Sequence, residues 1–448
     1  MSIERPGLNR AFVALQYRPF RLLFLSTVFS GIGGQLQTVA NLWQVYALTE
    51  SALHLGFTGL ARAVPIILFS LAGGVIADRV DRRKIILMAQ LANVVAVLLL
   101  AVLSATGLVQ VWHIYAITFL HAALIAVSAP AQRAAIPSLV PRHHLVNAMA
   151  LNSAVNQLDR MVAPALGGIL IALFGLPFTY GINGGAHFAA AAALGFISLG
   201  ALPAPARTSP LQSLLEGLAF VRVRSIIVVL LATDAAAMIF GSYQALLPIV
   251  AGQYSVGPAG YGILASAPAI GGFLAAIGVM YLGDFPYKGR LIVGAILVYC
   301  GFLVGLAWAP SFLLACVVAV GLGLTNSLQA VPRNALIQLL SPDELRGRVT
   351  SFQHMLTAGM PALGQGLMGG AAAAVTAPVA LVVWALLCAI INVGILARRP
   401  DLRARDLGAA TDRVRTSEPM PPRAIAWQPA PATADARRSP SGRQPPPG

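Results

Sequence analysis

The sequence predicts an all-α polytopic membrane protein with twelve transmembrane helices in two halves of six. Of its 448 residues, 57% are hydrophobic and 10% are charged, and its mean hydropathy is +0.77. A soluble domain of ordinary composition is far less apolar than this. Apolar runs of about 20 residues, the length needed to cross about 30 Å of hydrocarbon, recur along the chain. The third observation is that the polar connections alternate between basic ones and ones without Lys or Arg.

The twelve apolar runs define the predicted spans. The amino-terminal stretch carries arginines but no small-residue cleavage site, so we expect the first span to be retained and not removed as a signal peptide. The predicted spans are residues 20–47, 54–77, 85–106, 111–133, 145–173, 178–200, 226–251, 259–282, 291–309, 312–332, 347–372 and 377–396.

The net charge of +15 could indicate nucleic-acid binding, so the distribution of the cations decides its meaning. The alternate connections contain no Lys or Arg; they lie near Glu50, Leu108, Gly175, Gly257, Pro310 and Thr376. Such asymmetry predicts both termini in the cytoplasm by the positive-inside rule, and no nucleic-acid partner. The cations assigned to the cytoplasmic side are Arg79, Arg82, Arg83, Lys84, Arg133, Arg142, Arg207, Arg222, Arg224, Lys288, Arg290, Arg333, Arg346 and Arg348.

The chain divides into two similar halves. Arg133 matches Arg333 at an offset of 200, and Pro164-Ala165-Leu166-Gly167 recurs as Pro361-Ala362-Leu363-Gly364. A parallel repeat of this kind predicts a substrate site between two rocking halves. The predicted segments are a cytoplasmic start (1–19), a first half (20–200), a cytoplasmic linker (201–225), a second half (226–397) and a disordered cytoplasmic tail (398–448).

The connection between the second and third spans is the most specific motif. It reads Gly73-Gly74-Val75-Ile76-Ala77-Asp78-Arg79-Val80-Asp81-Arg82-Arg83-Lys84. This loop resembles the signature of the major facilitator superfamily, although Asp81 stands where the pattern has Gly. The resemblance implies a gate at the cytoplasmic end, closed against the eleventh helix. The alternative is an ordinary basic cytoplasmic loop whose acidic residues have no role in gating. The residues that fit the gate motif are Gly74, Asp78, Arg79, Arg82 and Arg83.

The fifth span contains Ala163-Pro164-x-x-Gly167-Gly168, which is similar to the antiporter motif of that superfamily with Ala163 in place of Gly. Pro and Gly here predict a hinge, formed by Pro164, Gly167 and Gly168, between the halves; an ordinary kinked helix is the alternative. The flanking stretches 129–141 and 147–153 resemble the branch that contains enterobactin-type siderophore exporters and macrolide efflux pumps. This resemblance spans about residues 15–397 and implies efflux of a siderophore or a hydrophobic drug, and with it multidrug resistance.

Ionisable side chains at membrane depth are expensive and are candidates for function. Asp159, Arg160 and Asp234 are the predicted proton-coupling residues, with structural ion pairing as the alternative. Asp159 and Arg160 are sequence neighbours and point about 100° apart on a helix, so they need not neutralise one another. We expect Arg62 to extend towards the outer surface of the membrane.

The superfamily resemblance implies that helices one, four, seven and ten line the cavity. Each polar residue on these helices can contact a ligand or simply bond a neighbouring helix. The predicted cavity residues are Gln37, Asn41, His121, Tyr243, Gln244, Asn326 and Gln329.

The three cysteines fall inside predicted spans without metal-ligand spacing, so we expect no metal site. Signatures of nucleotide-binding, hydrolase, metalloprotease and acyltransferase sites are absent from the sequence, so we expect neither a cofactor nor an enzyme. The predicted function is export of a small amphipathic molecule by alternating access, as a proton antiporter, from a monomer in the inner membrane. Its partners would be membrane lipid, the small-molecule substrate and protons. Nutrient uptake is the main alternative; a channel and a membrane-embedded enzyme are more distant ones.

Overall fold

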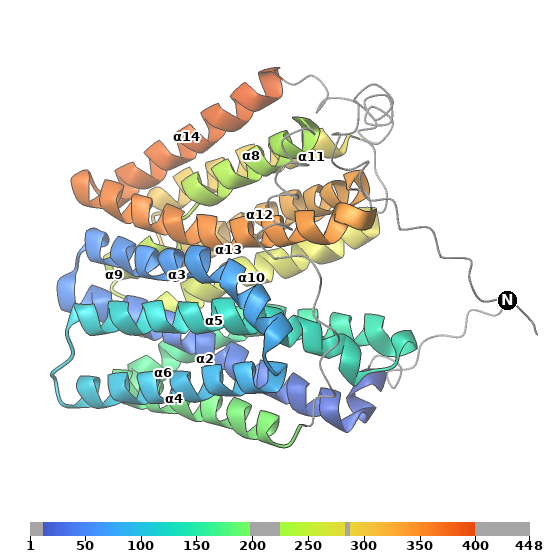
Figure 1. The fold of residues 1–448 in the computed structure, drawn as a ribbon. Helices are drawn as coiled ribbons and strands as arrows, with labels where there is room; N and C mark the ends of the chain where they lie inside the picture. Colours follow the sequence, from blue (N-terminus) through green and yellow to red (C-terminus); the bar gives the residue numbers. More distant parts are fainter. Residues whose placement is uncertain (1–11, 198–224, 283–286, 342, 399–448) are drawn as a thin grey trace, which may run out of the picture.

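The computed structural model describes residues 12–197, 225–282, 287–341 and 343–398, and these segments form a bundle of long helices (Figure 1). The predicted linker, most of the amino-terminal segment and the tail lie outside the described residues, so the predicted division into segments remains a prediction. Among the described residues the secondary structure is helical throughout, apart from turns and short connections.

The first half contains five continuous helical elements and two short 3₁₀ turns. They are η1 (Val13–Gln16), α2 (Arg18–Thr49), α3 (Ala52–Arg79), α4 (Arg82–Ala105), α5 (Val111–Leu139), η2 (Arg142–His144) and α6 (Leu145–Gly195). α6 is two spans joined at Gly175, whose φ of 78° and ψ of 172° are not helical. A side chain is disfavoured at this φ, and Pro177 follows, so the chain turns here and begins the sixth span.

The second half begins at α8 and ends at α14. Its elements are α8 (Ser225–Phe240), η3 (Gln244–Leu246), α9 (Leu247–Gln253), α10 (Gly257–Leu282), α11 (Lys288–Ala307), α12 (Phe312–Leu340), α13 (Asp343–Ala374) and α14 (Ala377–Arg398). α8, η3 and α9 together make the seventh span, which is broken near Gly241. The Tyr299 hydroxyl donates to the carbonyl oxygen of Gly241 at 2.5 Å, so the break does not leave this carbonyl without a partner.

Ten helical stretches of the described residues are long and apolar enough to cross a membrane. One of them, Arg142–Gly195, contains the two spans that Gly175 separates, and α13 supplies the twelfth helix. The predicted all-α fold of twelve transmembrane helices is therefore confirmed.

Two predicted helix ends are wrong in the same way. α5 continues to Leu139 and α12 to Leu340, several residues beyond the predicted ends at 133 and 332. Arg133 and Arg333 therefore lie inside helices and not in the connections to which their charge assigned them. Both helices pass through internal prolines, which transmembrane helices tolerate.

The two halves are joined by two helix pairs. In the first half α6 packs against α2 and α4, and α3 against α5; in the second half α12 packs against α10 and α11, and α13 against α8. Between the halves α6 packs against α10, and α3 against α13. In Figure 1 the first half lies below and the second above, with α3 and α10 between them.

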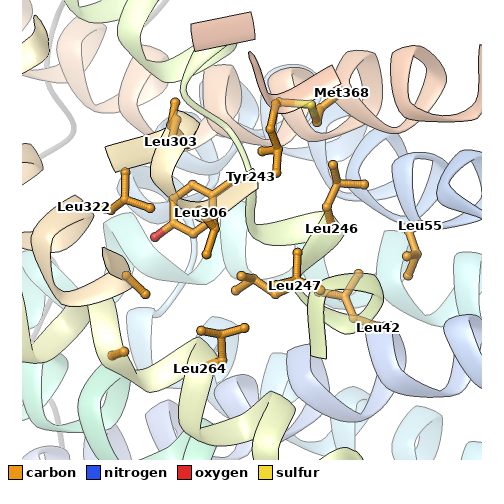
Figure 2. Close-up of a cluster of buried hydrophobic side chains, with 14 of the residues drawn as sticks. Leu42, Leu55, Tyr243, Leu246, Leu247, Leu264, Leu303, Leu306, Leu322 and Met368 are labelled. Carbon is orange, nitrogen blue, oxygen red and sulfur yellow. The ribbon is translucent and has the colours of Figure 1, made fainter. Parts of the chain in front are cut away.

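The buried apolar core joins the halves at one end of the bundle. We call the end with Arg82, Arg142 and Lys288 the basic end, and the end with Glu50 and Gly175 the far end. One cluster of buried side chains runs through the second half and includes residues of the first half that lie near the far end, among them Leu42, Val45 and Leu55. Figure 2 shows Leu42 and Leu55 beside Leu246, Leu247 and Met368 of the second half.

At the basic end the first half has a separate core. This cluster includes Phe20, Leu23, Ile86 and Leu194, and all of its described members belong to the first half. Apolar burial therefore joins the halves at the far end, whereas near the basic end the described core of the first half is separate from that of the second.

Candidate functional site

Glycines bring the two halves together near the far end. A Cβ atom at Gly168 of α6 would lie 2.8 Å from the Cα of Gly262 of α10. A Cβ at Gly56 of α3 would likewise lie 2.9 Å from the Cα of Gly369 of α13. Real Cβ atoms do not approach backbone so closely, so both inter-half contacts require glycine.

The predicted hinge residues lie at this contact. Gly168 faces α10, while Gly167 faces Leu36 and Val39 of α2, within its own half. The backbone amide of Ala165, the residue after Pro164, donates to the Ser266 hydroxyl oxygen of α10 at 2.9 Å, which adds a hydrogen bond between the halves. The segment stays helical and the break falls at Gly175, so its bending remains a prediction.

Asp159 is buried against α2, and no described cation pairs with its carboxyl group. Its side chain is 6% exposed, and its Oδ2 has no hydrogen-bond partner. The carboxyl lies against Gly31 of α2, where a side chain of any size would collide with it. Asp159 therefore faces α2 and not the lipid.

Arg160 faces the interior of the bundle on another side of α6. The exposed residues Ser153, Asn156 and Arg160 recur at spacings of three and four and form one polar stripe. The apolar exposed residues Leu158 and Val162 lie on the other side of this helix. On either flank of the stripe α6 packs against α2 and α10, so the stripe faces the space between these two helices.

Arg62 also faces inward, and the expectation that it extends to the outer surface is wrong. The exposed apolar residues of α3, including Phe57, Val64 and Leu68, point about 120° to 160° away from it on the helix. The Arg62 side chain has a solvent-accessible surface but is surrounded by protein, within electrostatic range of Arg160 on α6 and His121 on α5. It lies ten residues from the start of α3, about 15 Å along the helix.

His121 belongs to a buried polar cluster of the first half. Its Nδ1 bonds the Asn93 Oδ1 of α4 at 2.9 Å, and the ring of His187 lies 5.8 Å away. His187 in turn bonds the Gln90 Oε1 of α4 through Nδ1 at 2.7 Å. The buried Nε2 of His187 has no partner among the described residues.

Asn41 and Gln37 are buried in the packing of α2. The Asn41 amide donates to the Thr118 hydroxyl at 2.9 Å, and its Oδ1 accepts from the Tyr180 hydroxyl at 3.1 Å. Tyr180 also lies 2.8 Å from the Gln44 Oε1. Gln37 is 2% exposed and neither of its amide atoms has a partner. A ligand would have to displace packed neighbours to reach either residue.

In the second half Asp234 of α8 and Arg333 of α12 form a buried ion pair, with each side chain 2% exposed. Arg333 also donates to the Gln329 Oε1 at 2.7 Å and to the Asn334 Oδ1 at 3.2 Å. Gln329 donates to the Asn326 Oδ1 at 3.2 Å. Asp234 therefore has the cation that its own helix lacks.

The remaining predicted cavity residues of the second half differ in exposure. Asn326 and Gln244 are exposed, whereas Gln329 and Tyr243 are each 2% exposed. Tyr243 lies in the apolar cluster at the break of the seventh span (Figure 2). Asn326 and Gln329 are thus linked by hydrogen bonds to Arg333, whereas Tyr243 lies apart from this group.

The arginines of the loop after α3 hold the first half together. Asp81 caps α4 by accepting from the Arg83 amide at 2.9 Å. The Arg82 guanidinium donates to the Ala134 carbonyl of α5 at 2.9 Å, and Arg83 donates to the Leu194 carbonyl of α6 at 3.1 Å. The side chains of Gly74, Asp78 and Arg79 lie outside the described residues, so the gate remains a prediction.

The sequence did not reveal the partners of the interior polar groups. Tyr180, His187 and Gln90 are single polar residues in apolar helices, and the sequence offers no pattern that joins them. A signal for Arg333 was present: the run Ala335-Leu336-Ile337 after it continues the apolar helix. This continuation indicates a buried arginine and not the start of a loop.

The twelve-helix bundle, its two six-helix halves and the polar groups between them define a transporter of the major facilitator fold. The chain belongs to the family described as transmembrane secretion effector, whose model matches residues 9–428. The predicted superfamily is thereby confirmed, as is the prediction that the protein is a transporter and not an enzyme.

Relatives and solved structures agree with this assignment. The chain is 27% identical to the enterobactin exporters EntS of Shigella boydii serotype 18 and of Escherichia coli O139:H28, over 369 residues, which are 81% of this chain and 86% of each relative. The fold resembles the nucleoside transporter NupG (TM-score 0.65, 12% identity, 85% of this chain and 98% of that one). It also resembles the D-xylose-proton symporter (TM-score 0.64, 12% identity, 85% and 97%). The protein is a multi-pass transporter of the inner membrane that exports a small-molecule substrate.

Proposed function

We propose that this protein exports a small amphipathic molecule, a siderophore or a hydrophobic drug such as a macrolide, by alternating access and proton antiport. The observation that supports this mechanism is the one-sided contact between the halves. Glycine pairs and a shared apolar core join the halves at the far end, while at the basic end the described core of the first half is separate from that of the second. A substrate site between them would be reached from the basic end.

The proposed orientation places the basic end and both termini in the cytoplasm. Lys and Arg gather in the connections at that end, as the positive-inside rule requires. With this orientation the described conformation receives substrate from the cytoplasm, the starting point of export. Release to the other side would require the far-end contacts to part and the predicted gate at Asp78 to close.

Asp159 is the proposed proton carrier. Asp234 has Arg333 as its counter-ion, whereas Asp159 has no described cation on its carboxyl group. An ionised carboxylate without a counter-ion is unfavourable in a low-dielectric interior, so a proton is the counter-ion that remains available. Because Asp159 is next to the interior-facing Arg160 and close to the contact with α10, its protonation can respond to movement of the halves. The transporter would act as a monomer, since each chain contains both halves.

Deletion and complementation in the source cell test this function. We expect loss of the gene to lower the iron-chelating activity of the medium and raise it inside the cells, or to sensitise the cells to macrolides. The wild-type gene should restore export and Asp159→Asn should not, while Asn152→Ala, a change on the same helix, serves as the control. Unchanged distribution of both siderophore and drug, or loss of uptake of a supplied nutrient, would reject the proposal.

A further inference from the structure

Two arginines face the interior of the first half and have no anionic partner in the described part of the chain. Arg62 of α3 and Arg160 of α6 are exposed on the faces of their helices that point away from lipid, and their charges interact. Among the described residues, neither guanidinium forms an ion pair or a hydrogen bond. α3 and α6 make at most marginal contact with one another, so the two side chains approach each other across an interior space and not within a packed interface.

The neighbouring carboxyl group does not neutralise them. Asp159 precedes Arg160 in sequence, but its carboxyl lies against Gly31 of α2. The other described acids of the first half, Glu50 and Asp81, lie in the connections at the far end and the basic end. Two cations are therefore placed at membrane depth with no described counter-charge.

In the second half, the interior arginine has a counter-ion within the protein. There Arg333 is buried with Asp234 and two side-chain amides, so the charge is matched within the protein. In the first half the cations are exposed and unmatched, and they repel each other. Unpaired charge inside a membrane protein is unfavourable and marks a ligand or ion path. The missing partner would then be an anion from outside the described residues.

His121 and the glycines of α2 add to this site. His121 interacts with Arg62, and its Nδ1 is occupied by Asn93, so its Nε2 remains available to a ligand. This Nε2 is 3.6 Å from where a Cβ of Gly34 would be. A side chain at Gly34 would therefore contact the imidazole, and glycine at this position leaves that contact unmade.

We propose that Arg62 and Arg160, with His121 beside them, bind an acidic group of the transported molecule, so that the substrate is an amphipathic anion. The inference rests on the transport function proposed above, because it assigns the substrate's charge. A guanidinium binds a carboxylate or a phenolate through directed, charge-assisted hydrogen bonds. The apolar remainder of the substrate would lie against the aliphatic and aromatic side chains between the halves.

Binding of a matched pair of probes tests the proposal. The full-length protein is placed in nanodiscs of zwitterionic phosphatidylcholine, so that no anionic lipid headgroup competes, and binding of radiolabelled 2-hydroxybenzoate is measured. The neutral competitor is 2-hydroxybenzamide, which has the same ring and hydroxyl group. We expect saturable binding of the benzoate and at least tenfold weaker competition by the amide.

Four variants locate the site. Arg62→Gln and Arg160→Gln should each weaken benzoate binding about tenfold, or ~1.4 kcal/mol. Arg160→Lys keeps the charge and should bind with intermediate affinity, and size-exclusion profiles check that each variant is folded. Arg142→Gln removes an exposed arginine at the basic end and should leave binding unchanged.

Three results would overturn the proposal: no saturable binding of the benzoate, equal competition by the amide, or unchanged affinity in both glutamine variants. The result of this binding test is independent of the result of the export test in the deletion strain. If cells export siderophore or drug but the probes are not distinguished, the anion site is wrong and export stands. If the probes are distinguished but the deletion strain is unchanged, the proposed function is wrong and the anion site stands.

Discussion

Breaking the buried ion pair between Asp234 and Arg333 should destabilise the second half strongly. Each side chain is 2% exposed, so water cannot replace a lost partner. Removing one member of such a pair typically costs about 3 to 5 kcal/mol, because the other charge is left buried. For a unit of 150–250 residues, 1 kcal/mol shifts Tm by about 2 to 4 °C, so Asp234→Asn should lower Tm on the order of 10 °C.

The two single variants should differ in their pH dependence. In Arg333→Gln the remaining carboxyl can become neutral by taking up a proton, and each unit of lower pH makes this less unfavourable by about 1.4 kcal/mol. In Asp234→Asn the remaining guanidinium stays charged. The destabilisation by Arg333→Gln should therefore shrink from pH 8 to pH 5, and that by Asp234→Asn should not.

The assay is thermal unfolding in detergent, followed by tryptophan fluorescence and by size-exclusion chromatography. The double variant Asp234→Asn/Arg333→Gln leaves no buried charge and should recover most of the lost stability, to within roughly 1 to 2 kcal/mol of wild type. Arg142→Gln, at an exposed arginine, is the control. Single variants that melt like wild type, or losses that simply add in the double variant, would show that Asp234 and Arg333 do not stabilise the fold as a buried pair.

Three further predictions concern the first half and the contact between the halves. Gly168→Leu should part α6 from Gly262 at the far end, so that a thiol reagent labels cysteines introduced there faster than in wild type; unchanged labelling would argue against the contact. Tyr180→Phe should cost about 1 to 3 kcal/mol, because it leaves the Asn41 oxygen without its donor, and chemical unfolding would measure this. Asp159→Asn should abolish substrate-induced proton movement in proteoliposomes while the protein remains folded, and retained proton movement would exclude Asp159 as the carrier.

Composition and the length of the apolar runs were sufficient for the number of helices, since any segment that crosses hydrocarbon must be apolar for about 20 residues. The repeated segments were sufficient for the two halves of six helices. The motif in the connection after the second span was sufficient to predict the superfamily. The ends of α5 and α12 were missed because Arg133 and Arg333 were taken as loop residues, although apolar residues follow both.

The partners of interior groups could not be predicted, because they depend on how helices face one another. Asp234 and Arg333 are 99 residues apart and belong to different spans. The position of Arg62 along its helix gives its depth in the membrane but not the side of the helix on which it lies. For this reason the sequence led to the wrong expectation that Arg62 extends to the outer surface. Its interior direction follows only from the structure, in which the exposed apolar side chains of α3 cover the opposite side of the helix.

The most direct test of the account is the direction of flux in proteoliposomes under an imposed pH gradient. With an acidic interior, a proton antiporter should accumulate the siderophore or drug that the deletion strain identifies as its substrate, as protons leave. Accumulation should stop when an ionophore dissipates the gradient and when Asp159 is replaced by Asn. Accumulation driven by an alkaline interior, or flux that is independent of the gradient, would contradict export by proton antiport.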